Sequence, residues 1–530
     1  MENSVVFIFY LCSLFSLRNF RVIPVNTPSV FEERFPDSTH FPQNTGKLPV
    51  SNPSKIRVGI SDLHKRNTFP AGKVIPLPGI ISMTTGKMAM NAFADTEPRQ
   101  YGLPFLKVPE TRDIIMYEIN IHAFSPTDNL SGVIKGLNSI KALGANVIWL
   151  MPIYPVGKLK SIGSPYCVRN FEKINPEFGS LNELRNLVIQ AHRRGMSVIL
   201  DWVADHSSWD NPWISHKAWY QQDGSGNIIS PPGTGWKDVA ALDYHNPDMR
   251  MAMIRAMKYW ILAANIDGYR CDAADRIPED FWQQAIDSLK AIPHHKLILL
   301  AEGNSARNFK AGFQMNYGWD FYKRLKEVFE KDSVASMLAT ADKAENQYVP
   351  AGDEILRFTS NHDLDQDDNT PIALFHQKQG SLAAFVLALT IGGVPLIYDG
   401  QEVGCPVRLS IYRKNPIDWS TNRGMWIVYK QLISIRKTSE AIKKGRIHWY
   451  GNKDVAAYER QSGAQKVLVL VNVRDKQIKY IPDPSIAGTI WLNALDHDKR
   501  VKLPASISLK PFAYQILKSP MPKVGSGPGK

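Results

Sequence analysis

Three acidic residues stand at the ends of strand-like segments, at a spacing that suits carboxyl groups working together on one bond. Asp272 closes the segment GYRCD, Glu302 closes LLAE, and Asp363 follows FTSNH. Asp272 precedes Glu302 by 30 positions and Glu302 precedes Asp363 by 61, about one and two strand–helix units. Because parallel strands of one barrel end on the same rim, the three carboxylates are expected to converge.

Carboxyl groups that share a small space raise each other's proton affinity, so one can stay protonated while another remains an anion. That combination supplies a general acid beside a nucleophile or base, which is what cleavage of a glycosidic bond requires. A gap of about 5 to 5.5 Å between the two groups retains the anomeric configuration, whereas about 6.5 to 9.5 Å admits a water and inverts it. The sequence leaves both outcomes open.

Other polar side chains accompany the three acids. Alternate residues of a strand share a face, so Arg270 and Asp272 are expected to project together, with Cys271 turned to the other side. Each polar residue taken alone has a structural explanation as a helix cap, a turn former or a charge partner. Capping does not explain their joint occurrence, which favours a site. The remaining candidates at strand ends are Asp201, His206 and His362.

Eight apolar strand-like segments must position these residues, and helix-like periodic segments separate several of them. The strand-like segments are 114–121, 146–151, 197–203, 266–271, 297–301, 313–317, 355–359 and 394–398. The clearest amphipathic segments are 181–194, 249–264 and 281–291. Eight alternations over about 300 residues predict an α/β fold, a closed parallel (β/α)8 TIM barrel within 98–440.

Two regions depart from this alternation. The segment 205–246 is too long for an ordinary connection, so we expect a loop subdomain after the third strand. We expect most of its tryptophans to form a small core, and at most one or two to stack on sugar rings. These rings belong to Trp209, Trp213, Trp219, Tyr220 and Trp236. Helical patterns end near residue 445, and 441–517 are expected to form an antiparallel β domain.

Composition excludes several classes of protein. The 530 residues are 44% hydrophobic and 21% charged, which is incompatible with disorder as the dominant state. The net charge is +13, but basic residues are scattered among acids, so no specific nucleic-acid partner is expected. The four cysteines lie far apart without a CxxC, which argues against a disulfide scaffold and a thiolate metal site. No apolar segment reaches the roughly 20 residues of a spanning helix.

The four motifs DWVADH, GYRCDAAD, LLAEG and FTSNHD together resemble the signature regions of the alpha-amylase family of retaining glycoside hydrolases. The segments SPYCVRNFEKINPEFGS and GGVPLIYDGQEVG resemble the same family. The resemblance spans about 101–517 and implies a barrel, a loop subdomain and a C-terminal β domain. It implies hydrolysis of α-1,4-linked glucans through a covalent glycosyl-enzyme. The alternatives are a transglycosylase and a non-catalytic relative that binds carbohydrate or protein.

The resemblance also implies roles for the candidate residues. Asp272 would be the nucleophile, Glu302 the acid that then acts as base, and Asp363 a ligand of sugar hydroxyls that stabilises the transition state. Arg270 would hold Asp272 ionised through a charge-assisted hydrogen bond. The residues expected to contact or orient the sugar are Tyr166 as an aromatic floor, His206 and His362 as hydrogen-bond donors, and Asp201 as an orienting group.

A structural calcium is common in the family, and this sequence departs from the usual pattern. Asp205 stands before His206, where the family often has asparagine, and Asp275 and Arg276 replace a common Lys-His pair. Asp205 could still offer an oxygen to Ca²⁺. The histidine of that Lys-His pair is missing here, which favours an enzyme that needs no metal and no other cofactor.

The two ends of the chain bear on its location. The apolar stretch 5–17 has the length of an export signal but follows Glu2 and not basic residues, and it would permit membrane attachment. Residues up to 97 are expected to form an irregular extension, and 518–530 a tail. Because the expected partner is an α-glucan, which can be polymeric, we expect a secreted, periplasmic or surface-attached monomer. Chain-length preference and endo or exo action stay open.

Overall fold

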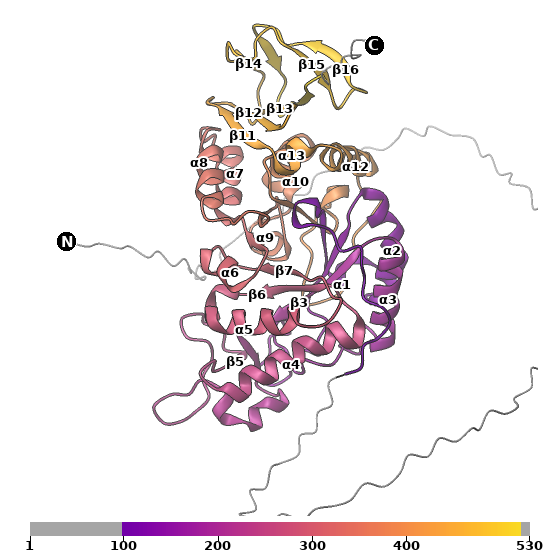
Figure 1. Ribbon diagram of the computed structural model, residues 1–530, viewed down its shortest axis with the longest axis vertical. Helices are drawn as coiled ribbons and strands as arrows, with labels where there is room; N and C mark the ends of the chain where they lie inside the picture. The colour runs from indigo at the N-terminus through magenta and orange to yellow at the C-terminus, as the bar shows by residue number, and fades with distance from the viewer. Residues whose placement is uncertain (1–97, 521–530) are drawn as a thin grey trace, which may run out of the picture. The chain divides into compact units, whose positions relative to one another are not determined.

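Eight parallel strands close into a barrel, with helices along its outside (Figure 1). The computed structural model describes residues 98–520; the apolar stretch 5–17 and the other residues of 1–97 and 521–530 lie outside the described part. The strands are β1 (Met116–Ile119), β2 (Val147–Leu150), β3 (Ser197–Val203), β6 (Gly268–Asp272), β7 (Ile298–Ala301), β8 (Met315–Tyr317), β9 (Glu354–Arg357) and β10 (Val394–Tyr398). Each overlaps a predicted segment, so the predicted fold class is confirmed.

The barrel strands are buried on both faces, as parallel strands covered by helices must be. This is why they appear in the sequence as continuous apolar runs and not as alternating ones. Their hydrogen-bonded order is β1-β10-β9-β8-β7-β6-β3-β2, which returns to β1. All eight carboxyl ends therefore lie on one rim, where the polar residues of the motifs follow.

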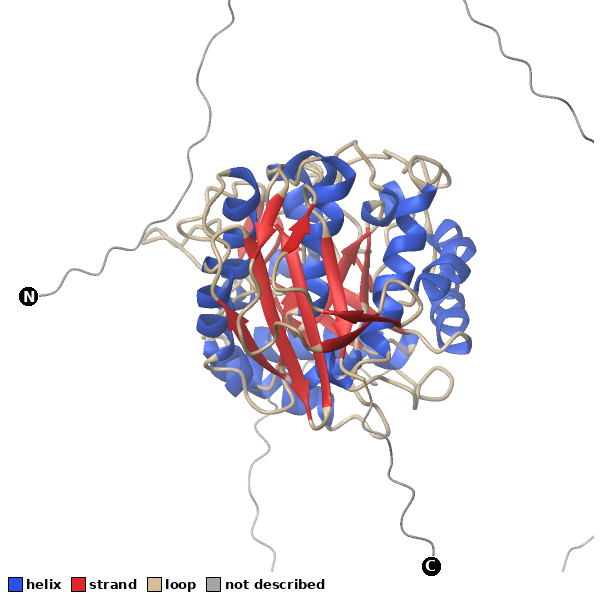
Figure 2. Cartoon of the chain, turned by 90° about the horizontal axis from the view of Figure 1, so that it is seen from above, coloured by secondary structure: helices blue, strands red, loops and turns tan. Residues whose placement is uncertain are grey.

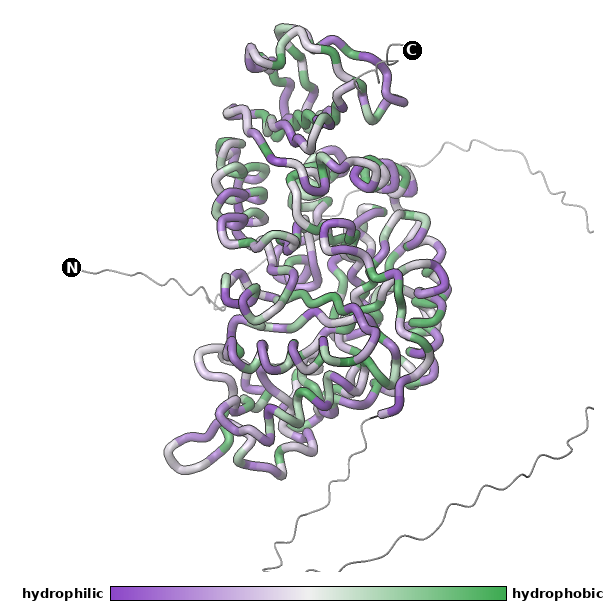
Figure 3. Tube along the Cα trace, in the orientation of Figure 1, coloured by the Kyte–Doolittle hydropathy of each residue, from purple (hydrophilic) through white to green (hydrophobic). Residues whose placement is uncertain are grey.

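Helices lie around the outside of the barrel (Figure 1), and the view from above shows them around the strands, with the C-terminal sheet nearest the viewer (Figure 2). They are α1 (Ile121–Phe124), α2 (Leu130–Leu143), α3 (Leu181–Arg193), α4 (Pro247–Ala264), α5 (Glu279–Lys290), α6 (Ala306–Ala311), α7 (Trp319–Glu330), α8 (Met337–Asn346), α9 (His362–Asp367), α10 (Pro371–Leu374), α11 (Gln377–Thr390), α12 (Arg423–Lys437) and α13 (Glu440–Lys444). Many of these helices have hydrophilic residues on one face and hydrophobic residues on the other (Figure 3). The hydrophobic face packs on the core, and the hydrophilic face contacts water.

Helix α3 shows how the local sequence sets such an element. Ser180 caps its first turn, and Glu183 returns a hydrogen bond to the Ser180 backbone, a reciprocal capping box. The buried face carries Leu184, Leu187 and Val188 at helical spacing. The helix therefore begins at a defined residue and packs one apolar stripe against the barrel.

The predicted loop subdomain follows β3. Strands β4 (His206–Ser208) and β5 (Val239–Ala241) pair antiparallel, and the short helices η2 (Pro212–Ser215) and η3 (Lys217–Trp219) lie between them in sequence. The subdomain leads directly into α4, which starts at Pro247 behind the capping side chain of Asn246.

Between α13 and residue 520, the end of the described part, the regular elements are all strands. A six-stranded sheet has the order β11-β12-β13-β18-β15-β16, and β14 pairs with β17. The bounds are β11 (Arg446–Tyr450), β12 (Val455–Ser462), β13 (Gln465–Asn472), β14 (Ile478–Tyr480), β15 (Ile490–Asn493), β16 (Lys499–Lys502), β17 (Ile507–Leu509) and β18 (Tyr514–Lys518). Along β13, Val467 and Val469 join the main core, while Leu468 and Leu470 join a separate core of the C-terminal strands. The period of two thus places this sheet between two apolar cores.

Cys167, Cys271 and Cys405 are buried free thiols, and Cys12 lies outside the described residues. Within residues 98–520 no helix combines the length and the apolar character needed to cross a bilayer.

Candidate active site

The pairing of β3 with β6 brings the first group of predicted residues together. In this parallel pair Asp201 lies opposite Arg270, and Val203 lies opposite Asp272. Nη1 of Arg270 donates to Oδ1 of Asp201 and to Oδ1 of Asp272, each at 2.8 Å. One guanidinium nitrogen therefore holds two carboxylates from neighbouring strands.

Glu302 follows β7 and reaches the same guanidinium. Nη2 of Arg270 lies 2.9 Å from Oε2 of Glu302. The backbone N–H of Ala273 donates to this oxygen at 2.7 Å. Ala273 adopts the left-handed conformation, φ 44° and ψ 41°, which is uncommon for a residue with a Cβ and recurs at functional sites. Asp272 and Glu302 are therefore neighbours at one guanidinium.

Exposure separates the groups that a ligand can reach from those that support them. The side chains of Arg270 and Asp201 are 0% exposed. Those of Asp272 and Glu302 are 13% and 19% exposed, and that of Asp363 is 41% exposed. The three acids predicted to act on a substrate are the accessible ones.

Asp363 lies in the first turn of α9, beyond the end of β9, and joins the site through His362. The side chain of Asn361 caps this helix by accepting from the Leu364 N–H. Nε2 of His362 lies 3.4 Å from Oδ1 of Asp363 and 2.6 Å from the hydroxyl of Tyr166. The rings of His362 and Tyr166 stack with centroids 5.5 Å apart.

Tyr166 connects this histidine to the arginine group. Its hydroxyl donates to Oδ2 of Asp201 at 3.1 Å, and Nε1 of Trp149 donates to the same oxygen at 3.1 Å. His206, at the start of β4, places Nε2 3.2 Å from the backbone carbonyl of Tyr166. All eight predicted site residues thus belong to one connected network at the carboxyl ends of the strands.

Burial dominates the electrostatics of both Asp272 and Glu302. Burial raises the pKa of Glu302; the Arg270 charge opposes this, and the negative charge of Asp272 raises it further. Burial also raises the pKa of Asp272, and the Arg270 charge opposes it. The sequence led us to expect that Arg270 would keep the pKa of Asp272 low, and burial outweighs that effect. The Arg270 charge thus opposes protonation of both acids, and Asp272 also accepts a charge-assisted hydrogen bond from it.

His362 is held as an imidazolium. Burial alone would lower its pKa, but the charges of Asp363 and Glu118, with a hydrogen bond to Glu118, raise the pKa to about 9. Nδ1 of His362 donates to Oε1 of Glu118 at 2.5 Å. Its other nitrogen therefore also carries a proton at neutral pH and can donate toward Tyr166 or a sugar hydroxyl.

Sequence reasoning missed some supporting residues. Glu118 lies in β1 and is 0% exposed, and its signal was a lone acid inside the apolar segment 114–121. Tyr317, at the end of β8, accepts from Nε of Arg270 at 3.1 Å. A tyrosine in an apolar strand gives no such signal, because it suits a barrel core equally well.

The residues at the position of the family's calcium do not fit the ion. Nε of Arg276 donates to Oδ2 of Asp205 at 3.1 Å, and Nη2 donates to the carbonyl of Pro232 at 3.2 Å. A guanidinium therefore already binds the carboxylate and a carbonyl of the loop subdomain. Burial acts to raise the pKa of Asp205, but His206 and Arg276 outweigh it and lower the pKa. Ca²⁺ requires six to eight oxygen ligands, and no cluster of three acids, histidines or cysteines that could hold a metal occurs among residues 98–520.

A family model matches the sequence of this chain. The model for the alpha amylase catalytic domain matches residues 90–226 and 234–418, more than half of the chain. The chain belongs to the alpha-amylase family. The protein is thus an enzyme of the glycosidase type, and its family implies that its substrates are α-glucans.

Similar proteins include hydrolases and a transferase. Alpha-amylase 2 of Dictyoglomus thermophilum is 27% identical over 404 residues, which cover 69% of this chain and 68% of that protein. An alpha-1,4-glucan:maltose-1-phosphate maltosyltransferase of Rhodospirillum rubrum is 26% identical over 401 residues, covering 67% of this chain and 55% of that one. The crystal structure of a noncanonic maltogenic alpha-amylase from Thermotoga neapolitana gives a TM-score of 0.70 at 26% identity, covering 78% of this chain and 99% of that one.

Proposed function

We propose that the protein hydrolyses α-1,4-glucosidic bonds in starch fragments or maltooligosaccharides, with retention of configuration. The contact of Arg270 with both Asp272 and Glu302 is the observation that carries the proposal. It keeps two partly exposed carboxyl groups side by side with unequal environments, as an acid and a nucleophile require.

In the first step, protonated Glu302 donates its proton to the glycosidic oxygen while the Asp272 carboxylate attacks the anomeric carbon. The bond to the leaving sugar breaks, and a glycosyl ester on Asp272 forms. In the second step, the Glu302 carboxylate takes a proton from water, whose oxygen attacks the anomeric carbon and releases Asp272. Glu302 is then protonated again, so the enzyme returns to its starting state.

The other residues of the network bind and orient the sugar. Asp363, the most exposed of the acids, accepts hydrogen bonds from sugar hydroxyls. The imidazolium of His362 donates one, and Tyr166 offers its ring as a floor beneath the sugar being cleaved. His206 donates to the same sugar, and buried Asp201 fixes the positions of Arg270 and Tyr166. These contacts strengthen as the ring flattens toward the transition state.

We also propose that the enzyme needs no calcium, because the Arg276 guanidinium binds the Asp205 carboxylate in its place. An exported or surface location, a membrane attachment through the N-terminus and a monomeric state remain predictions from the sequence.

A second candidate is transfer of the glycosyl unit to another sugar. This reaction has the same first step, and in the second step a sugar hydroxyl takes the place of water. The similarity to a maltosyltransferase favours keeping it. Incubation with maltoheptaose separates the two: hydrolysis gives only shorter products, and transfer gives products longer than the donor. Proton NMR of the first products should show the α-anomer. Dominant longer products would refute hydrolysis, and initial β-anomer would refute retention.

A further inference from the structure

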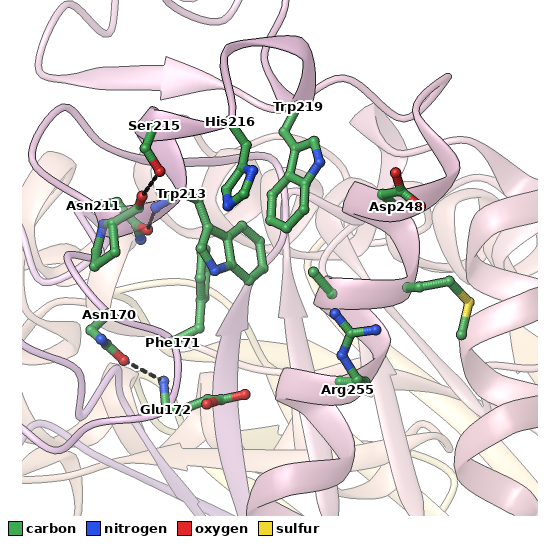
Figure 4. A pocket seen from close by; sticks show the side chains of 13 residues that line it. Asn170, Phe171, Glu172, Asn211, Trp213, Ser215, His216, Trp219, Asp248 and Arg255 are labelled. Atoms are coloured by element: carbon green, nitrogen blue, oxygen red, sulfur yellow. Dashed lines mark hydrogen bonds between the residues drawn. The ribbon is translucent and has the colours of Figure 1, made fainter. Parts of the chain in front are cut away.

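A cavity of about 640 Å³ lies between the loop subdomain and α4, apart from the active site (Figure 4). Its size falls in the range of roughly 300 to 1,000 Å³ that is usual for ligand sites. None of the eight active-site residues lines it. Its lining includes the aromatic residues Phe171, Trp213, His216 and Trp219 and the charged residues Asp248 and Arg255.

One wall of the cavity is aromatic. Trp213 rests on Phe171 with ring centroids 4.7 Å apart, and His216 stacks on Trp219 at 4.3 Å with 17° between the planes. The two indoles meet edge to face at 5.4 Å. Each indole therefore has a fixed orientation before any ligand arrives, which lowers the entropic cost of stacking on it.

Exposure separates these rings from the core of the subdomain. Tyr220 is 1% exposed, and its hydroxyl lies 2.7 Å from Oγ of Ser207, as in a satisfied core residue. Trp213 and Trp219 are only partly buried, and both line the cavity. The sequence predicted that one or two tryptophans serve as platforms, and these two have the surroundings for it.

The other side of the cavity is polar. Asp248 and Arg255 are seven residues apart on α4 and so share one face of the helix. Glu172, in the segment that follows Tyr166 in sequence, also lines the cavity. Figure 4 shows the Arg255 guanidinium directed toward the space below Trp219. Among residues 98–520 the Arg255 side chain forms no hydrogen bond or ion pair, so its donors remain available to a ligand.

The mixture of charges indicates the class of ligand. Asp248 offers acceptors beside the guanidinium donors of Arg255, and this pairing suits the neighbouring donors and acceptors of vicinal hydroxyls. An aromatic face opposite such groups suits the C–H face of a sugar ring. The combination therefore fits a neutral carbohydrate.

We propose that this cavity is a second glucan-binding site, which holds a segment of the polymeric substrate away from the catalytic residues. The inference rests on the proposed function for the identity of the glucan. Its role is to raise the local concentration of chains at the active site, so it affects polymers and spares short substrates.

The test uses electrophoresis of Glu302→Gln protein through gels that contain soluble starch, with and without added Trp219→Ala or Arg255→Ala. Trp426→Ala, a partly buried tryptophan of α12, is the matched control. Each cavity variant should weaken retention by starch roughly three- to tenfold, the worth of about 0.7 to 1.4 kcal/mol. The control should be retained like the parent, and thermal unfolding should show that every variant is folded at the temperature of the gel.

Activity with otherwise wild-type protein supplies the second measurement. Trp219→Ala should lower kcat/KM on soluble starch and leave kcat/KM on a chromogenic maltotrioside unchanged. Equal starch retention by parent and both cavity variants overturns the inference, and so does an equal loss on both substrates. A parent without hydrolytic activity refutes the proposed function alone, since starch retention that depends on Trp219 would still support the binding site.

Discussion

Two buried arginines of the barrel, Arg270 on β6 and Arg357 on β9, hold pairs of carboxylates in different ways. Arg357 is 1% exposed and contacts Asp342 and Glu345 of α8, both 6% exposed, on the outer side of the barrel. Its guanidinium lies over the ring of Phe321 at 4.8 Å. In this group every charge is sealed from solvent.

Arg270 and its carboxylate partners are only partly buried as a set. The side chains of Arg270 and Asp201 are buried. Those of Asp272 and Glu302 are partly exposed and lie at the carboxyl ends of strands. Ion pairs that only hold a helix against a strand, such as those of Arg357, do not require solvent-exposed carboxylates. The comparison therefore teaches that exposure of the acids, more than the presence of a buried ion pair, distinguishes chemistry from structural support.

The largest expected effect separates the two groups by activity. Asp272→Asn should lower kcat/KM on maltoheptaose roughly 10⁴- to 10⁶-fold, because it removes the nucleophile of a covalent mechanism. Asp342→Asn, the matched change in the Arg357 group, should keep kcat/KM of the folded enzyme within about threefold and instead lower its unfolding temperature. Comparable rate losses in both variants would remove the distinction.

The arginines themselves test the same comparison through stability. Arg357→Met leaves two buried carboxylates without a partner and should lower the free energy of unfolding by about 3 to 5 kcal/mol. The folded enzyme should keep its activity, as measured by urea unfolding beside initial rates. Arg270→Met should reduce the rate of the folded enzyme by at least about 10²-fold, since the pKa values of Asp272 and Glu302 both depend on it. A fully active Arg270→Met would contradict the assignment.

The pH dependence of stability sharpens the contrast through His362. The folded pKa of His362, about 9, exceeds its ordinary value of 6.5, so its stabilisation is complete below pH 6.5 and is lost as pH rises through 9. The loss should approach roughly 3 kcal/mol. His362→Gln should flatten this fall in urea unfolding between pH 6 and pH 9.5, whereas His245→Gln, at a fully exposed histidine, should leave it unchanged. A wild-type curve that His362→Gln does not alter would show that His362 is neutral.

The smallest expected effect concerns Arg276, a charged contact that is partly exposed. Chelation with EDTA should leave the unfolding temperature and activity of the parent unchanged, because Arg276 binds Asp205. Arg276→Ala should cost about 1 kcal/mol of stability through the loop subdomain, and Arg500→Ala, at an exposed site on β16, should cost none. Loss of parent stability with EDTA, restored by Ca²⁺, would show a metal site after all.

The fold could be predicted because barrel strands buried on both faces leave continuous apolar runs. The eight runs overlap the eight strands, and the strand-end acids meet because parallel strands share a rim. The partner of His362 could not be predicted, since Glu118 comes from a strand 244 positions earlier. Only closure of the barrel brings these two residues together.

The loop subdomain shows the same limit. The contact of Arg276 with Asp205 joins residues 71 positions apart, and the tilted ring contact of Trp213 with Phe171 depends on the path of an irregular loop. Tryptophans in such a loop carry no periodicity that tells a platform from a core residue. Their partial exposure in the folded chain supplied the distinction.

Trapping the covalent intermediate tests the central claim most directly. The enzyme would be incubated with a 2-deoxy-2-fluoro maltosyl fluoride, digested with pepsin and analysed by peptide mass spectrometry. The account predicts one added fluoromaltosyl group on Asp272, formed in the parent and absent from Asp272→Asn. A label on Asp201, Glu302 or Asp363, or full turnover of the probe through a β-configured product without any label, would contradict it.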